Sequence, residues 1–148
     1  MEAMLKSGNG HIKIGLIVGI VGFVVVVFFS FGGSFCGGLF SSIVLGSVAG
    51  FLTSRHANAG TRDNASKLGT VSGGIAGIFA LLAQVSSGLL PSLMIAILGA
   101  YGRLPGDVGN LPSDVFSMFF LPSVLNGIIG LIAAGIAGSI AASKGFDS

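Results

Sequence analysis

Long apolar segments, each bounded by a few polar or charged residues, dominate the chain. Residues 14–54 contain no ionisable side chain except Cys36, and residues 68–102 contain none except Tyr101. Residues 115–143 contain none at all. Uncharged apolar runs of about 18 residues or more are typical of helices that cross a bilayer, whose hydrocarbon core needs about 20 residues. The pattern predicts an all-α integral membrane protein.

The apolar segments divide into spans joined by short polar loops. Four transmembrane helices are predicted, at residues 14–31, 35–54, 69–90 and 115–143. Pro91 interrupts the third apolar run, and residues 92–101 are apolar but too few to cross a bilayer. We expect these residues to form a short interfacial or re-entrant helix between spans three and four, or a bent extension of span three. Asp63-Asn64 is expected to cap the start of span three.

The two halves of the chain share a pattern that predicts an internal duplication within one membrane domain, residues 1–148. The matching positions are Lys13, Gly15 and Gly19 with Lys67, Gly69 and Gly73, at an offset of 54, and Gly46, Ser54 and Arg55 with Gly135, Ser143 and Lys144, at an offset of 89. Both halves begin on the same side, which predicts a parallel repeat of two tandem hairpins, 14–54 and 69–143, joined by the loop 55–67. The change of offset predicts an outer insertion at about residues 84–118.

Charge sets the expected orientation. One side of the predicted membrane holds Lys6, Lys13, Arg55, Arg62, Lys67 and Lys144, and the other holds Arg103, Asp107 and Asp114. Because cytoplasmic loops carry an excess of Lys and Arg, the N- and C-termini and the loop 55–67 are expected in the cytoplasm, most simply of a prokaryotic cytoplasmic membrane. The net charge of +2 is accounted for in this way, without nucleic-acid binding.

Glycine, at 26 residues, is about twice as frequent as in an average protein. Small residues four positions apart let helix backbones approach closely in lipid. The glycines expected to pack helices are Gly15, Gly19, Gly46, Gly50, Gly73, Gly77, Gly130, Gly135 and Gly138. Span four is small on nearly every side, so we expect it to be the central helix of the bundle, or to pack on another subunit as well.

Candidates for chemistry are few. Gln84 and Asn126 are the amides deep in the spans, at about 22–26 Å from the inner boundary. This equal depth predicts a hydrogen bond between them, with a polar lining for a solute path as the alternative. Cys36 is the only cysteine in the sequence, which excludes an intrachain disulfide and an all-cysteine metal site. His11 and His56 lie at the inner boundary, where a solvated role is expected rather than pigment ligation.

No serine has a credible base in the sequence, and no glycine run has the setting of a nucleotide loop. We therefore expect a protein that is not an enzyme and has no metal or catalytic cofactor. A bound lipid or pigment is left open.

The basic loop together with Gly37-Gly38, Ala49-Gly50 and Lys67-x-Gly69-x-x-x-Gly73 resembles uncharacterised small glycine-rich four-span membrane proteins of prokaryotes, over about residues 36–80. The resemblance implies a four-span fold and carries no function.

The expected role is a non-catalytic accessory or scaffold subunit of a larger membrane complex, such as an energy-transducing one. Other integral membrane subunits and lipid are the expected partners, and a homo-oligomer is left open. The residues expected to dock the partner are Pro91, Tyr101, Arg103, Asp107 and Asp114. The alternatives are a small oligomeric channel or carrier for a neutral solute, and a membrane-complex assembly factor.

Overall fold

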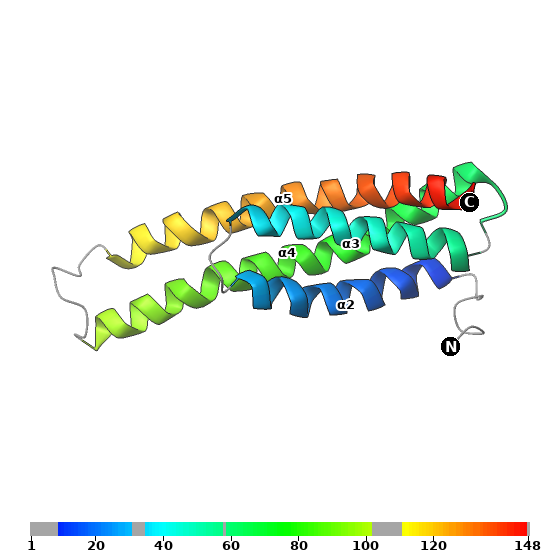
Figure 1. Cartoon of the computed structure of the whole chain (residues 1–148). Helices are drawn as coiled ribbons and strands as arrows, with labels where there is room; N and C mark the ends of the chain where they lie inside the picture. Colours follow the sequence, from blue (N-terminus) through cyan, green and yellow to red (C-terminus); the bar gives the residue numbers. More distant parts are fainter. Residues whose placement is uncertain (1–8, 31–34, 58, 102–110, 148) are drawn as a thin grey trace.

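The computed structural model describes residues 9–30, 35–57, 59–101 and 111–147. These residues form four helices that pack side by side, and no strand (Figure 1). The helices are α2 (Gly10–Ser30), α3 (Phe35–His56), α4 (Arg62–Ala100) and α5 (Leu111–Phe146). All four are long and apolar enough to cross a membrane. The prediction of an all-α, four-span membrane protein is confirmed at this level.

The segment after Pro91 is not a separate helix. Residues 92–100 continue α4, which runs through Pro91 for 39 residues in all. Proline removes one backbone donor, but helices in membranes tolerate it when neighbouring groups re-satisfy the backbone. The next residue, Ser92, is buried, and its Oγ donates a hydrogen bond to the Gly88 carbonyl oxygen at 2.9 Å. Of the alternatives, the extension of span three is therefore the one observed, and Pro122 is carried inside α5 in the same way.

The two middle helices of the sequence form the centre of the bundle. α3 and α4 pack against each other, and each also packs against α2 and α5, whereas α2 and α5 barely touch. α5 is therefore peripheral rather than central, contrary to expectation. A two-fold axis relating the hairpins would make the α3–α4 contact equivalent to an α2–α5 contact, so the packing does not follow the expected repeat.

One face of α5 carries small residues, and the opposite face carries bulky ones. Its small face lies on α3 and α4 so closely that a Cβ at Gly46 would overlap the Ala134 backbone, and one at Gly50 would overlap Gly138. Its outward face carries a row of isoleucines, about half exposed: Ile128, Ile129, Ile132, Ile136 and Ile140. The sequence reading missed this row because glycine and alanine alternate with it at helical spacing.

The other glycines named from the sequence differ in their surroundings. A Cβ at Gly15 would lie 2.8 Å from the Ser72 carbonyl oxygen, and one at Gly73 would lie 2.5 Å from the Ala134 carbonyl oxygen. Gly19 faces the Phe79 ring, and Gly77 faces Leu131 and Ala134 at 3.0 Å. Gly135 has more room, since the nearest atom, the Thr70 carbonyl oxygen, would be 3.9 Å away.

A Gly50→Ala substitution tests whether this backbone contact holds the bundle. We expect it to lower the free energy of unfolding by ~2 kcal/mol, because the added methyl overlaps the α5 backbone, which cannot move away as a flexible side chain could. Gly74→Ala is the matched control, since nothing lies within 4 Å of the new Cβ. Helix propensity alone should leave that variant unchanged or more stable by up to ~1 kcal/mol. Reversible unfolding in mixed micelles titrated with a denaturing detergent measures both, and equal effects would contradict the contact.

Candidate functional site

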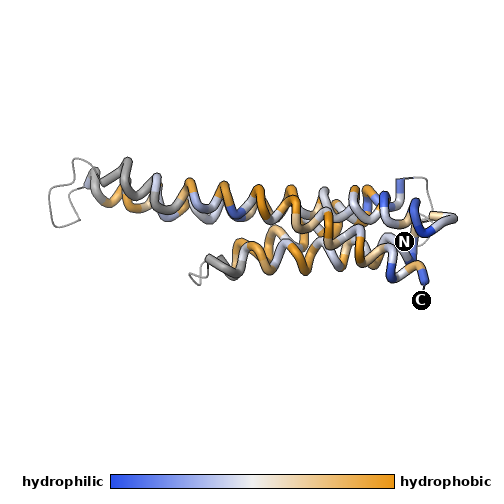
Figure 2. The backbone as a smooth tube through the Cα atoms, turned by 90° about the horizontal axis from the view of Figure 1, so that it is seen from above, coloured by the Kyte–Doolittle hydropathy of each residue, from blue (hydrophilic) through white to orange (hydrophobic). Residues whose placement is uncertain are grey.

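Ionisable residues gather at one end of the bundle, where α2 begins and α5 ends (Figure 2). We call this the charged end; it contains His11, Lys13, Arg55, His56, Arg62, Asp63, Lys67, Lys144 and Asp147. Among the described residues, no group of three or more His, Cys, Asp or Glu side chains could hold a metal ion. His56 is exposed, with Nδ1 3.1 Å from the Leu52 carbonyl oxygen.

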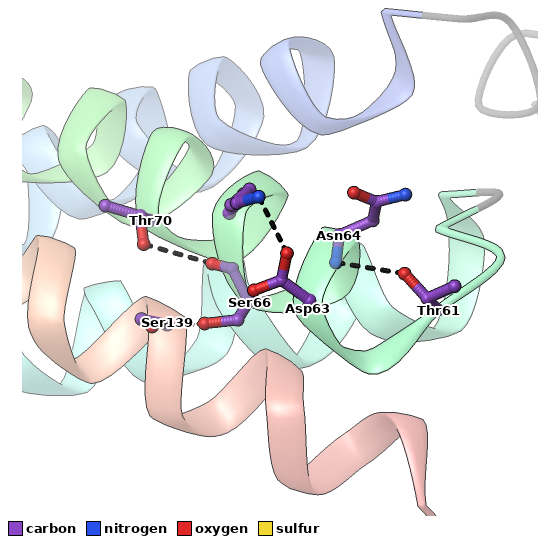
Figure 3. Close-up of polar contacts among 7 residues, drawn as sticks. Thr61, Asp63, Asn64, Ser66, Thr70 and Ser139 are labelled. Atoms are coloured by element: carbon purple, nitrogen blue, oxygen red, sulfur yellow. Dashed lines mark hydrogen bonds and ion pairs between the residues drawn. The ribbon is translucent and has the colours of Figure 1, made fainter.

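Two ion pairs organise the first turn of α4. Lys67 Nζ lies 2.7 Å from Asp63 Oδ2, one helical turn away (Figure 3). Arg62 lies 3.5 Å from Asp147, which directly follows α5. The N-cap is Thr61, whose Oγ1 accepts a hydrogen bond from the Asn64 backbone N–H at 3.3 Å. The cap therefore lies two residues earlier than expected, since Asp63 is already in the first turn.

Hydroxyl groups link α4 to its neighbours nearer the middle of the bundle. Ser66 and Ser139 share a hydrogen bond of 2.7 Å between α4 and α5 (Figure 3). Thr53 Oγ1 donates to Ser72 Oγ at 2.8 Å between α3 and α4, and both side chains are fully buried. The Thr53–Ser72 bond pairs two polar groups in the buried interior, and the small size of all four side chains lets the helices stay close. The sequence reading missed them because small serines and threonines in spans also bond to their own helix.

Gln84 is the most unusual side chain in the interior. It is 4% exposed, and neither its Nε2 nor its Oε1 has a hydrogen-bond partner among the described residues. The amide lies against Gly38 of α3, where a Cβ would be 2.6 Å from Nε2, and near Gly130 of α5, where the distance would be 3.7 Å. The expected hydrogen bond to Asn126 is therefore not formed.

Small apolar side chains fill the space between Gln84 and the hydroxyl pair lower in the bundle. Ala76, Ala80 and Ala83 of α4 and Ala134 of α5 are all 0% exposed. At Gly46 and Gly73 the helix backbones meet, so the described residues leave little room between the helices at these positions. Small apolar side chains therefore lie between the Gln84 amide and the Thr53–Ser72 hydroxyl pair.

α4 and α5 are much longer than α2 and α3, and they continue past them at the end opposite the charged end (Figure 1). Gly38 lies beside Gln84, and Gly46 and Gly50 lie beside Ala134 and Gly138. By this register, residues 88–100 of α4 and 111–122 of α5 extend beyond the start of α3, and we call them the outer extension. Its described exposed apolar residues are Leu90, Leu93, Met94, Ile97 and Leu121.

The residues named for partner docking fall in or next to this extension. Pro91 is half-buried inside α4, and Tyr101 is exposed just after α4 ends. Arg103 and Asp107 lie outside the described residues, and Asp114 lies in α5 with a side chain that is not described.

No family model, curated protein or solved structure matches this chain.

A Gln84→Leu substitution tests the isolated amide. We expect it to raise the free energy of unfolding by ~1 kcal/mol, because it replaces an unpaired buried amide with an apolar group of similar size. Ser72→Ala is the comparison, and it should lower that free energy by ~1 kcal/mol by removing the acceptor of Thr53. A clear loss of stability in the Gln84 variant, measured by the same unfolding titration, would mean that the amide is paired in the membrane.

Proposed function

We propose that this protein is a non-catalytic accessory or scaffold subunit of a larger membrane complex, and that the outer extension docks the partner. The observation that carries the proposal is the mismatch between the two hairpins. α2 and α3 are 21 and 22 residues long, about 32–33 Å, which matches one bilayer core. α4 and α5 are 39 and 36 residues long, about 54–58 Å.

Tilting the bundle in the membrane does not bring the whole length of α4 into the hydrocarbon core. Ile97 lies about 42 Å along α4 from Gly69, so bringing both within a core of about 30 Å needs a tilt of about 45°, beyond the usual range. Because α2 and α3 pack on α4, the same tilt would shorten their reach to about 23 Å and leave them too short to cross. The extension therefore stands outside the hydrocarbon core.

The extension is too apolar to face water alone. Leu93, Met94 and Ile97 are 54%, 65% and 55% exposed. Apolar side chains with such exposure are stable in contact with lipid. Outside the hydrocarbon core of the bilayer they form an apolar patch of the kind that marks protein contacts. A partner subunit whose own surface rises above the membrane would cover them, with Tyr101 at the rim.

The enclosure of Gln84 favours this role over transport. A channel or carrier for a neutral solute would need a wet path that includes Gln84, yet Gln84 is enclosed by α3 and α5 within one chain. Association of several copies would not bring this buried amide to a shared pore. An assembly factor would use the same outer extension, and stoichiometry distinguishes it from a permanent subunit.

The docking proposal is tested by intact-mass spectrometry of the complex purified from its native membrane in mild detergent. We expect a stoichiometric larger partner with the wild-type chain and at least about a tenfold loss of that partner with Leu93→Ala/Ile97→Ala. Ile132→Ala/Ile136→Ala is the matched control. Both pairs are one helical turn apart, and the control residues are 59% and 57% exposed.

The control variant should keep the partner. Loss of the partner in the control alone would move the docking surface to the outward face of α5. A lone monomer or symmetric homo-oligomer of the wild-type chain would overturn the proposal, and transient partners without stoichiometry would favour the assembly-factor alternative.

We further propose that the charged end faces the cytoplasm, as the excess of basic residues there favours. Single cysteines at Thr61 and Tyr101, both exposed, in a Cys36→Ser background report the orientation. We expect a membrane-impermeant maleimide to label the Tyr101 site in intact cells, and the Thr61 site only after permeabilisation. The reverse pattern would place the charged end outside.

A further inference from the structure

One face of α4 is covered by α2 and α3 in the part of the bundle nearer the charged end. Glycines of α2 lie so close to Ile75 and Phe79 that a Cβ on them would press on both side chains. Thr53 of α3 bonds to Ser72, and Ala76 belongs to a buried apolar cluster with residues of α2 and α3. We call this the covered face of α4; it contains Ser72, Ile75, Ala76 and Phe79.

The same face of α4 is open in the outer extension. Four exposed apolar residues there lie 18 positions after the four residues of the covered face, in the same order: Leu90, Leu93, Met94 and Ile97. At about 100° per residue, such a separation makes five full turns, so each residue points in the same direction around the helix axis as its counterpart. The outer extension therefore presents the surface that α2 and α3 bury lower in the bundle.

Tyr101 completes this surface. Its backbone N–H donates to the Ile97 carbonyl oxygen at 3.1 Å, so the helical turn continues to this residue. We call the five residues the open strip: Leu90, Leu93, Met94, Ile97 and Tyr101. They are between 48% and 77% exposed, whereas Ser72 and Ala76 on the covered face are 0% exposed.

The register of α4 persists through Pro91. Gly73 and Gly77 face α5, and Pro91 and Ile95, five turns further on, are half-buried. Ser92 beside them is buried. The side of α4 that faces α5 is thus the less exposed side in the outer extension too. The strip is open because α4 continues past α2 and α3 (Figure 1), and not because the helix has rotated.

The chemistry of the open strip favours a helix as its occupant. Its residues follow the spacing i, i+3, i+4, i+7 and i+11, which forms a seam for the side chains of another helix. The strip contains no Asp, Glu, Lys or Arg, so apolar side chains are sufficient to cover it. An extended chain would leave its backbone N–H and C=O groups unpaired there, because the α4 backbone is hydrogen-bonded within its own helix.

Two copies of this chain cannot pair strip to strip in one membrane. Each copy carries α2 and α3 on the same face of α4, directly below its own strip. Packed helices have axes about 8–10 Å apart, and each helix is itself about 10 Å across. Bringing two strips together would force these helices of the two copies into the same space. A different subunit is therefore the better occupant.

We propose that the open strip binds an amphipathic α-helix of the partner subunit, which packs along α4 directly above α2 and α3. This inference rests on the docking function proposed above and names the structure that the partner contributes. The contact from Leu90 to Tyr101 is about 16 Å long, which corresponds to about three helical turns. Outside the hydrocarbon core the opposite face of the partner helix meets water, so that face is polar.

Photo-crosslinking in the native membrane tests the occupant. The photoreactive residue p-benzoylphenylalanine replaces Leu90, Tyr101 or Leu121, one at a time in the full chain, and mass spectrometry identifies the crosslinked peptides. Leu121 is the matched control, because it is 57% exposed in the outer extension but lies in line with Ile128 and Ile132 on the outward face of α5. We expect one partner to crosslink at Leu90 and Tyr101, and not at Leu121.

The interval between the two crosslinked positions on the partner distinguishes a helix from an extended chain. A helix rises about 1.5 Å per residue, so these positions should be about eleven residues apart. An interval of about five residues, as in an extended chain, would overturn the helix and leave the docking function intact. Equal crosslinking at Leu121, or crosslinks to a second copy of this chain, would overturn the strip as the site of a partner helix. Purification of the wild-type chain without any stoichiometric partner would instead overturn the docking function, and this inference with it.

Discussion

The structure depends on the absence of side chains where α5 meets α3 and α4. In lipid, burial of apolar surface does not drive helices together, so the association rests on dispersion between closely approaching backbones. Gly46, Gly50 and Gly138 bring main-chain atoms into direct contact, and Gly69 and Gly73 extend that contact along α4. The outward position of the isoleucine row follows from this contact, because the small face of α5 lies against α3 and α4.

Close approach also dictates which polar groups the interior can hold. Between backbones this near, only short hydroxyl side chains fit and reach a partner, as Thr53 and Ser72 do. Gln84 is longer, and it is accommodated only because Gly38 and Gly130 leave room for it. The same glycines that admit the amide offer it no side-chain partner, which explains how a polar group can be enclosed and still be unpaired.

Element type could be predicted from the sequence, because a bilayer allows few structures and long uncharged runs are unambiguous. Helix ends near prolines could not be predicted. Proline usually ends a helix in a water-soluble protein, whereas α4 continues through Pro91. The position of α5 was also beyond the sequence, because its composition shows that it packs closely but not on how many sides. The equal depth expected of Gln84 and Asn126 did not produce a hydrogen bond between them, because depth along a helix does not fix the direction in which a side chain points. Gly38 is the signal that was overlooked, as a glycine at the depth of a buried amide on a neighbouring helix.

The two interhelical hydroxyl bonds described above, and the tightest backbone contacts, lie in the half of the bundle nearer the charged end. The other half contains Gln84, whose amide has no hydrogen-bond partner among the described residues, and the parts of α4 and α5 that extend beyond α2 and α3. The contacts near the charged end should therefore resist local opening of the helices there, since local stability follows the density of such contacts.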